Sequence, residues 1–450
     1  MPMQNYLLTK PIRRLIMSIF IGLFFVIAPL LVLYTSGYRY NWKLHRIDQT
    51  GVISIDAEPA DANVDLNGIR INQTMPIRLP NRAPGTYLLQ ISKDGYKSWR
   101  KDISVESSKS TYIKNIVLFK ENLPASFLPD DNKKTNSFWP SADGLYVIFS
   151  QIDQKGNNEY SLIDTNTGIK KPLPELAKKV LPKVSWSPYT HAALIQTEEN
   201  NIITLQIYDA ETNTLSDPSS YPAQSFGKQL IWSHTSKKAY FSHNDVVTSI
   251  TLSGSNDIEK IPKDLLWHVT EPDIIWLIDQ KQNIMYQNGH EAEATAYSNS
   301  RIIESIIERT ESRMIVKTDT GVVIYHMNPL GGINNNSALE LNTPSLLYNA
   351  STKEWLAWSP WELWTIYENA DATLFNRSSE YTIDVASLDN FGVLLLATNH
   401  SLTAFNPGYY VSQELWSGTG IERVSVNKKT KQVFFLGTVE QTRGIWQLGF

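Results

Sequence analysis

The sequence predicts a mainly β protein with an N-terminal single transmembrane helix, a small β-sandwich and then a seven- or eight-bladed β-propeller. Three observations lead to this prediction. Residues 15–34 contain no charged residue, residues 51–119 hold short strands between turn residues, and residues 138–450 repeat a strand pattern about every 39 residues. Charged residues make up only 19% of the 450-residue chain and aromatic residues 11%, a balance that favours β-structure with aromatic faces.

The apolar segment has the length of a membrane span. At a rise of 1.5 Å per residue, residues 15–34 match the roughly 30 Å hydrocarbon core of a bilayer. We therefore expect a transmembrane helix over 15–36 in contact with the lipid bilayer, between a short cytoplasmic tail (1–14) and a juxtamembrane segment (37–50). The alternative is a cleaved signal peptide, but its apolar region is shorter, roughly 7–15 residues, and no A-x-A-like cleavage site follows here.

Basic residues beside this segment favour one orientation only narrowly. Three precede it and three follow it: Lys10, Arg13, Arg14, Arg39, Lys43 and Arg46. The positive-inside rule therefore nearly ties, and the free N-terminal amine with the adjacent Arg13-Arg14 favours the N-terminus inside. We expect a single-pass protein of the cytoplasmic membrane whose C-terminal domains are extracytoplasmic.

Composition excludes several function classes. The chain has no cysteine, which rules out disulfides, cysteine-ligated metals and thiol catalysis. A chain of this length buries a core without such links. The formal net charge of −4 provides no basic field for a nucleic acid, so no nucleic-acid partner is expected.

Residues 51–119 show the pattern of a small β-sandwich. Val64 and Leu66 alternate with polar residues and lead into Asn67-Gly68, a two-residue hairpin signal because both residues tolerate positive φ. About six short strands in this segment are typical of a small sandwich or barrel.

The same segment resembles the PEGA domain family. The shared elements are Pro59-Ala60-Asp61-Ala62, Asn67-Gly68, Thr74-Met75-Pro76, Pro84-Gly85-Thr86-Tyr87, and Gly95-Tyr96 with Trp99. Asp61 replaces the glycine of the family's naming motif, and Met75 is inserted between the usual threonine and proline. The resemblance implies a non-catalytic β-sandwich of surface or envelope proteins, and it assigns no active site.

A strand repeat fills the rest of the chain after residues 120–137, which are polar and are expected to form a linker. Val184-Ser-Trp186-Ser-Pro188 recurs as Leu230-Ile-Trp232-Ser-His234 and as Leu356-Ala-Trp358-Ser-Pro360. We count eight units, each with a turn and two apolar strands, which is the signature of a β-propeller over 138–450. Because propellers close by pairing strands from their two ends, we expect a strand from 120–137 to complete the last blade.

Two details of the repeat stay open. Ser141-Ala-Asp143-Gly144 is similar to a blade turn of TolB-type and WD-repeat-like propellers, which implies the architecture but no particular function. Residues 302–311 could form either a helix turn or a strand.

A tryptophan cluster is the candidate binding face. Its members are Trp355, Trp358, Trp361 and Trp364. One reading is packing within a blade, and the other is an aromatic platform for a glycan or a partner protein, with Trp361 and Trp364 as its residues. Pro360 argues against a helix, and we expect Trp358 to be buried and Trp361 to lie at the rim.

No catalytic, cofactor-binding or metal residue is predicted. The eight histidines are scattered singly, and no H-E-x-x-H, G-x-S-x-G, P-loop or G-x-G-x-x-G motif occurs. His234 and His243 share one repeat unit, where they could meet. We therefore expect a non-enzyme without a cofactor.

These observations predict a membrane-anchored bacterial cell-envelope protein with a binding or structural role. Its partner would be an envelope protein or a glycan, contacted through the PEGA-like and propeller domains. The alternative is an envelope enzyme such as a glycan hydrolase, which would need converging carboxylates at the central mouth of the propeller.

Overall fold

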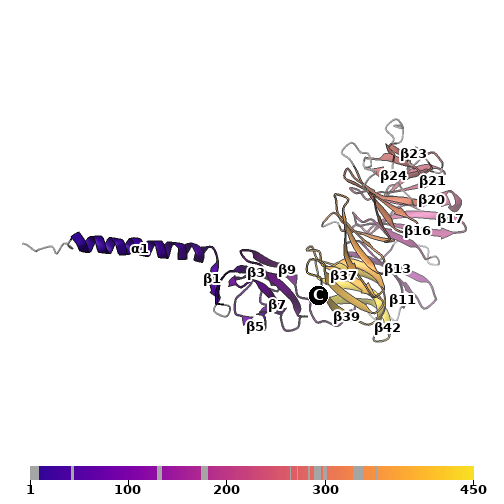
Figure 1. The fold of residues 1–450 in the computed structure, drawn as a ribbon. Coiled ribbons are helices and arrows are strands. Elements are labelled where there is room, and N and C mark those ends of the chain that lie inside the picture. The colour runs from indigo at the N-terminus through magenta and orange to yellow at the C-terminus, as the bar shows by residue number, and fades with distance from the viewer. Residues whose placement is uncertain are drawn as a thin grey trace, which may run out of the picture. The chain divides into compact units, whose positions relative to one another are not determined.

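The computed structural model describes residues 10–41, 45–128, 134–173, 181–263, 265–270, 272–281, 284–287, 295–296, 302–327, 338–349 and 352–450. The chain divides into two compact units, Met1–Glu121 and Asn122–Phe450 (Figure 1). Each unit is described by itself.

The first unit begins with a long apolar helix, α1 (Lys10–Thr35). Its segment Pro11–Thr35 has a mean hydropathy of 2.8 and is long and apolar enough to cross a membrane, and its large apolar side chains are exposed. The helix ends at Thr35, and Gly37 just beyond it has a φ of +84°, which suits glycine after a helix C-terminus. The Arg39 guanidinium donates to the Tyr34 carbonyl at 2.7 Å.

A β-sandwich forms the rest of this unit, after the hairpin of β1 (Tyr38–Asn41) and β2 (Arg46–Gln49). One sheet has the order β6-β3-β9 and the other β5-β4-β7-β8. The bounds are β3 Gly51–Glu58, β4 Asn63–Leu66, β5 Ile69–Ile71, β6 Ile77–Arg82, β7 Gly85–Ser92, β8 Trp99–Val105 and β9 Ser110–Val117.

The sandwich core comes from alternating residues of the two sheets. Ile53 and Ile55 of β3 are fully buried, as are Leu89 and Ile91 of β7. Side chains of a strand alternate between its faces, so these residues form one inner layer on each sheet. The predicted hairpin is present between β4 and β5, where Asn67 and Gly68 have φ of 51° and 76°.

The second unit is a β-propeller. Its described residues form eight sheets of antiparallel strands. The sequence alone did not decide between seven and eight blades. We number them sheet 1 to sheet 8 in chain order of their first strands. Sheet 1 consists of β11 Lys134–Pro140, β12 Tyr146–Ile152, β13 Asn158–Asp164 and β14 Lys170–Pro172. Sheet 2 consists of β15 Lys183–Trp186, β16 Ala192–Glu199, β17 Ile202–Asp209 and β18 Thr214–Leu215, with β19 Ser219–Pro222 also paired to β17. Sheet 3 consists of β20 Phe226–Trp232, β21 Ala239–His243, β22 Val246–Thr251 and β23 Gly254–Lys260, and sheet 4 of β24 Leu266–Thr270, β25 Ile274–Asp279, β26 Ile284–Gln287 and β27 Thr295–Ala296.

Sheets 5 to 8 follow the same order. Sheet 5 consists of β28 Ile303–Arg309, β29 Arg313–Thr318, β30 Val322–His326 and β31 Leu339–Leu341, and sheet 6 of β32 Ser345–Asn349, β33 Glu354–Trp358, β34 Glu362–Ile366 and β35 Ala372–Arg377. Sheet 7 consists of β36 Thr382–Ser387, β37 Leu394–Thr398, β38 Ser401–Asn406 and β39 Val411–Ser417. Sheet 8 consists of β40 Thr419–Asn427, β41 Gln432–Val439 and β42 Thr442–Gly449 with β10 Ala125–Ser126. A short 3-10 helix, η1 (Ala223–Ser225), precedes sheet 3. Residues 303–309, left open between helix and strand, are a strand.

The sheets pack face to face through apolar clusters, each shared by two consecutive sheets. Sheets 1 and 2, for example, share Ile148, Leu162, Ala193 and Tyr208, which are all buried. The first strands of neighbouring sheets adjoin one another, as β11 and β15 do, so these strands lie innermost. The repeated tryptophan has a role here, because Trp186 Nε1 donates to the Trp139 carbonyl at 2.9 Å and joins two innermost strands.

The ring closes between its last and first sheets. A buried cluster joins Phe138 and Val147 of sheet 1 to Phe434 and Ile445 of sheet 8, and Figure 1 shows β42 beside β11. The expected closing strand is confirmed, because β10 pairs with β42 as the outer strand of sheet 8. Residues 120–137, expected as a linker, therefore contain β10 and the start of β11.

One assignment of the repeat is wrong. Trp358-Ser-Pro360 was matched to Trp186-Ser-Pro188, which follows an innermost strand. It instead lies at the end of β33, the second strand of sheet 6, and the two strands that follow it, β34 and β35, are the third and fourth strands of that sheet. The error has a physical cause, because an apolar strand that ends in a turn gives the same local pattern at either place in a blade.

Candidate functional site

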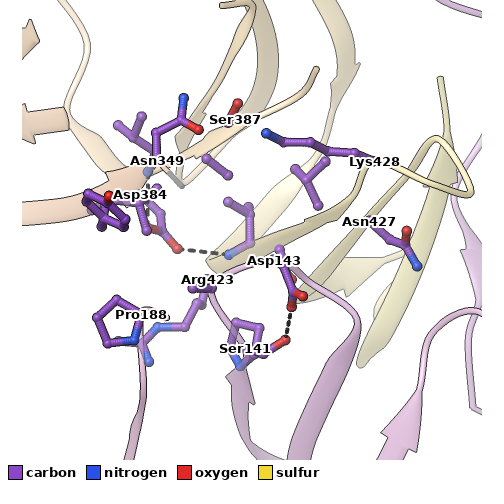
Figure 2. Close-up of a pocket in the computed structure, with 18 of the residues that line it drawn as sticks. Ser141, Asp143, Pro188, Asn349, Asp384, Ser387, Arg423, Asn427 and Lys428 are labelled. Carbon is purple, nitrogen blue, oxygen red and sulfur yellow. Dashed lines mark hydrogen bonds between the residues drawn. The ribbon is translucent and has the colours of Figure 1, made fainter. Parts of the chain in front are cut away.

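A cavity of about 730 Å³ lies against the innermost strands β32, β36 and β40. The turn after β11 and Pro188 in the turn after β15 complete its wall (Figure 2). Its charged lining residues are Asp143, Asp384, Glu422, Arg423, Lys428 and Lys429. Ligand cavities of proteins have volumes of roughly 300–1,000 Å³, so this cavity has room for a small molecule.

The turn of Ser141 to Leu145 sets one side of the cavity. Asp143 Oδ1 accepts hydrogen bonds from Ser141 Oγ at 2.7 Å and from the Leu145 amide at 3.1 Å, which fixes the turn. Gly144 has φ of +70°, and a Cβ there would lie 2.2 Å from the Val426 carbonyl oxygen of β40. Only glycine lets sheet 1 approach sheet 8 this closely.

Asp384 faces the cavity from β36, beside a register shift between Thr382 and Asp384 that re-aims the strand. Its carboxylate accepts hydrogen bonds from the amides of Val385 and Val424, both at 3.0 Å. Burial raises the pKa of Asp384 above its ordinary value, and the hydrogen bond from the Val424 amide and then the charge of Arg423 only partly oppose this effect. Asp384 therefore joins sheets 7 and 8 at the cavity wall (Figure 2).

The other two lining carboxylates have side-chain partners outside the cavity lining. Asp143 Oδ2 accepts a hydrogen bond from His191 Nε2 at 2.7 Å, and Glu422 accepts one from Arg443 at 2.9 Å. Burial alone would raise the pKa of Asp143, but the hydrogen bonds from His191 and Ser141 hold it below its ordinary value.

Two of the lining cations, unlike the carboxylates Asp143 and Glu422, have no side-chain ion-pair partner among the described residues. Within the described part of the chain, Arg423 and Lys428 form no ion pair, and Arg423 is exposed. Burial lowers the pKa of the half-buried Lys428, and the charge of nearby Asp389 opposes this effect without cancelling it. In Figure 2 the Lys428 side chain is directed toward the side of the cavity that carries Asn349 and Ser387.

A polar network joins the turns of sheets 1, 2 and 3. His191 lies between Asp143 and Glu211, with Nδ1 2.8 Å from Glu211 Oε1, and Lys237 bonds both Glu211 and Asp209. The hydrogen bond to Asp143, followed by that to Glu211, raises the pKa of His191 to about 9. Sequence analysis missed this network because its members are far apart in the chain; the only signal was acidic residues at strand-ending turns.

Tyr189 crosses the centre of the propeller near the cavity. Its ring stacks on His234 of the turn after β20, with centroids 3.9 Å apart, and meets the Tyr348 ring of β32 edge-on at 5.2 Å. Sheets 2, 3 and 6 therefore touch through one side chain, and Tyr348 also lines the cavity.

The tryptophan cluster is divided between core and surface. Trp355 and Trp358 are buried, and Trp364 is half-buried against the core between sheets 5 and 6. Trp361 is 51% exposed and meets the Tyr381 ring edge-on at 5.7 Å. The expected burial of Trp358 and rim position of Trp361 are confirmed, and Trp361 is the exposed member of the candidate binding face.

The two histidines of sheet 3 do not meet. His234 precedes β21 and stacks on Tyr189, while His243 ends β21 and lies 3.2 Å from Asp257. Among the described residues, no group of three or more His, Cys, Asp or Glu side chains is placed to hold a metal ion.

Comparison with known proteins identifies one domain and gives three distant likenesses. Residues 50–122 match the PEGA domain family, which confirms the resemblance in that segment. No curated protein matches the chain. The Dos1 propeller is 8% identical with a TM-score of 0.44, over 74% of this chain and 95% of that one. Hsv2 of Kluyveromyces lactis is 11% identical with a TM-score of 0.39, over 64% and 99%. An oligogalacturonate lyase from Vibrio parahaemolyticus is 13% identical with a TM-score of 0.39, over 72% and 92%. Likenesses this distant carry no functional argument.

Proposed function

We infer that this protein is a membrane-anchored bacterial cell-envelope protein with a binding or structural role, and that its propeller is the binding module. The observation that carries this proposal is the cavity of about 730 Å³ on the innermost strands. Binding sites are concave and largely pre-formed, and they combine apolar walls with a few polar groups. Trp358 and Leu346 supply apolar wall here, and the charged residues described above supply the polar groups.

Native mass spectrometry tests the binding role directly. The full-length protein is extracted from its own membranes in mild detergent and compared with Ser387→Trp, which places a large ring at the cavity wall. We expect a bound species with the wild type that is absent from the variant, with melting curves showing that both are folded. The same bound mass on both proteins, or none on either, would count against a binding role for the cavity.

Helix α1 supports anchoring in the cytoplasmic membrane, because its exposed apolar side chains favour lipid over water. We propose that the N-terminus is inside and that both β-domains are extracytoplasmic. Full-length protein should then resist carbonate extraction, and protease added to spheroplasts should digest residues 40–450. A mature N-terminus near residue 37 would establish a cleaved signal instead, and protection until lysis would reverse the topology.

The partner proposed for the outer surface is an envelope protein or a glycan, contacted at Trp361. Clustered aromatic side chains are typical of binding hot spots, and Trp361 and Tyr381 are both exposed. A photo-crosslinking residue placed at 361 should give a discrete adduct in native membranes. The same residue at Ile169, which is 55% exposed, is the matched control and should give none.

The enzyme alternative has one observation in its favour, the raised pKa of Asp384, because a general acid needs such a shift. We propose a non-catalytic role because all three lining carboxylates already accept hydrogen bonds from this chain. Hydrolysis of an envelope glycan that Asp384→Asn abolishes, with an unchanged melting curve, would reverse this choice.

A further inference from the structure

The hairpin of β1 and β2 follows the apolar helix directly and forms a separate two-stranded sheet. Helix α1 ends at Thr35 and β1 begins at Tyr38. Among the described residues, neither strand pairs with a strand outside this hairpin. A two-stranded hairpin on its own has little stability in water, so this one depends on contacts beyond its own ladder of hydrogen bonds.

Some of these contacts hold the base of the hairpin against the end of the helix. The Gly37 carbonyl accepts hydrogen bonds from the Thr50 amide at 2.9 Å and from Thr50 Oγ1 at 2.8 Å. The Arg39 guanidinium lies 3.8 Å from the centre of the Tyr34 ring, in the last turn of α1. If α1 spans the hydrocarbon core, the hairpin therefore starts in the headgroup layer, which is only about 5–8 Å thick on each side of a bilayer.

The two faces of the hairpin differ in polarity. Tyr40 lies directly opposite Ile47, and Arg39 lies opposite Asp48. Because side chains alternate between the faces of a strand, Tyr40 and Ile47 share one face, and Arg39 and Asp48 share the other. Tyr40 is 46% exposed and Ile47 is 56% exposed. The apolar face of the hairpin is thus open in the described structure, beside a helix whose own apolar side chains are exposed.

We propose that the face formed by Tyr40 and Ile47 docks on the lipid bilayer, at the boundary between headgroups and acyl chains. Tyrosine suits this boundary because its ring is apolar and its hydroxyl is polar, and isoleucine adds apolar area. Lipid is the occupant because this face continues the lipid-facing surface of α1 within a few residues of its end. The inference rests on the proposed anchoring by α1 and adds a second lipid contact, which sets the height of the β-sandwich above the membrane.

Fluorescence quenching in vesicles tests the proposal. Because the chain has no cysteine, one introduced cysteine carries a dye at a single position. Full-length protein with Ile47→Cys is labelled and reconstituted into phosphatidylcholine vesicles, with either a lipid that carries a nitroxide close to its headgroup or iodide in the buffer. We expect strong quenching by the nitroxide lipid. Quenching by iodide should be about threefold or more weaker than at the control position, because an anion does not enter this boundary.

Ile69→Cys is the matched control, because Ile69 is also an exposed isoleucine on a short strand of a hairpin. Ile69 pairs with Leu66, which pairs with Leu89, four residues along β7 from Gly85. Gly85 lies at the end of the sandwich where β3 begins, just after the β1–β2 hairpin. At about 3.3 Å per residue, Ile69 is roughly 13 Å from that end. Its label should be quenched by iodide and not by the nitroxide lipid.

Two variants at position 40 separate insertion from simple proximity to the membrane. Tyr40→Asp places a charge opposite the label at 47 and should raise iodide quenching to about the level at 69, because a charge is costly at this depth. Tyr40→Phe keeps the ring and should leave the label protected. A third label, in Leu23→Cys on the exposed surface of α1, tests the anchoring itself and should be quenched by a nitroxide near the end of the lipid acyl chain.

The outcomes distinguish the two levels of the proposal. Lipid quenching at 23 but not at 47, equal lipid quenching at 47 and 69, or an unchanged signal in Tyr40→Asp would overturn the docking of the hairpin and leave the anchoring by α1 intact. No lipid quenching at 23 would overturn the anchoring, and the docking with it.

Discussion

Ile445 tests whether the propeller is a closed ring. It lies on β42, is 1% exposed, and packs in the cluster that joins sheet 8 to sheet 1. Alanine removes three carbon atoms at about 0.8 kcal/mol each, or about 2.4 kcal/mol of transfer free energy. The residual cavity raises the expected loss in free energy of unfolding to about 3–4 kcal/mol.

Urea unfolding of the full-length protein in detergent, followed by tryptophan fluorescence, measures this loss. Ile202→Ala is the matched control, because Ile202 also lies on a propeller strand but is 48% exposed. It carries the same change in β propensity and should cost no more than about 1 kcal/mol. Equal losses for the two variants would refute the reasoning, because the junction of sheets 8 and 1 would then contribute nothing beyond an exposed strand position.

Three further predictions follow from the same structure. Deleting residues 438–450 removes β42, exposes a strand edge and should abolish cooperative unfolding of the propeller in calorimetry; an unchanged transition would disprove closure through β42. Protonated His191 stabilises the fold fully below pH about 6.5 and loses this effect as pH rises toward about 9, so the stability advantage over His191→Gln should shrink by about 1–2 kcal/mol across that range. A pH-independent difference would contradict the assignment. Trp358→Ala should lower stability by about 3–5 kcal/mol and Trp361→Ala by about 0.5 kcal/mol or less, and similar melting temperatures would show the burial assignment to be wrong.

The sequence predicted the fold well where the signal is local. The apolar run of α1, the Asn67-Gly68 hairpin and the apolar strand pairs are all contained within short segments. Closure by β10 was also predictable, because it follows from the general cost of a free strand edge. The place of Trp358-Ser-Pro360 within sheet 6 was not predictable from the sequence. This motif ends an apolar strand, and an apolar strand that ends in a turn looks the same whether it is the first or the second strand of its blade.

The candidate site could not be predicted from the sequence, for a different reason. Asp143 lies in a turn of sheet 1, Asp384 in sheet 7 and Arg423 in sheet 8, and they line one cavity only because the ring returns to its start. No spacing along the chain records such a meeting. The tryptophan cluster was visible as a pattern, but only burial separates Trp358 from Trp361.

The central claim, a membrane-anchored propeller that holds a ligand in its central cavity, is tested most directly by an experimental density map. The full-length protein would be purified from its own membranes without exchanging what it carries. We predict density for a bound molecule in the cavity, against the innermost strands β32, β36 and β40. An empty cavity, with a bound molecule at Trp361 or nowhere, would contradict the account.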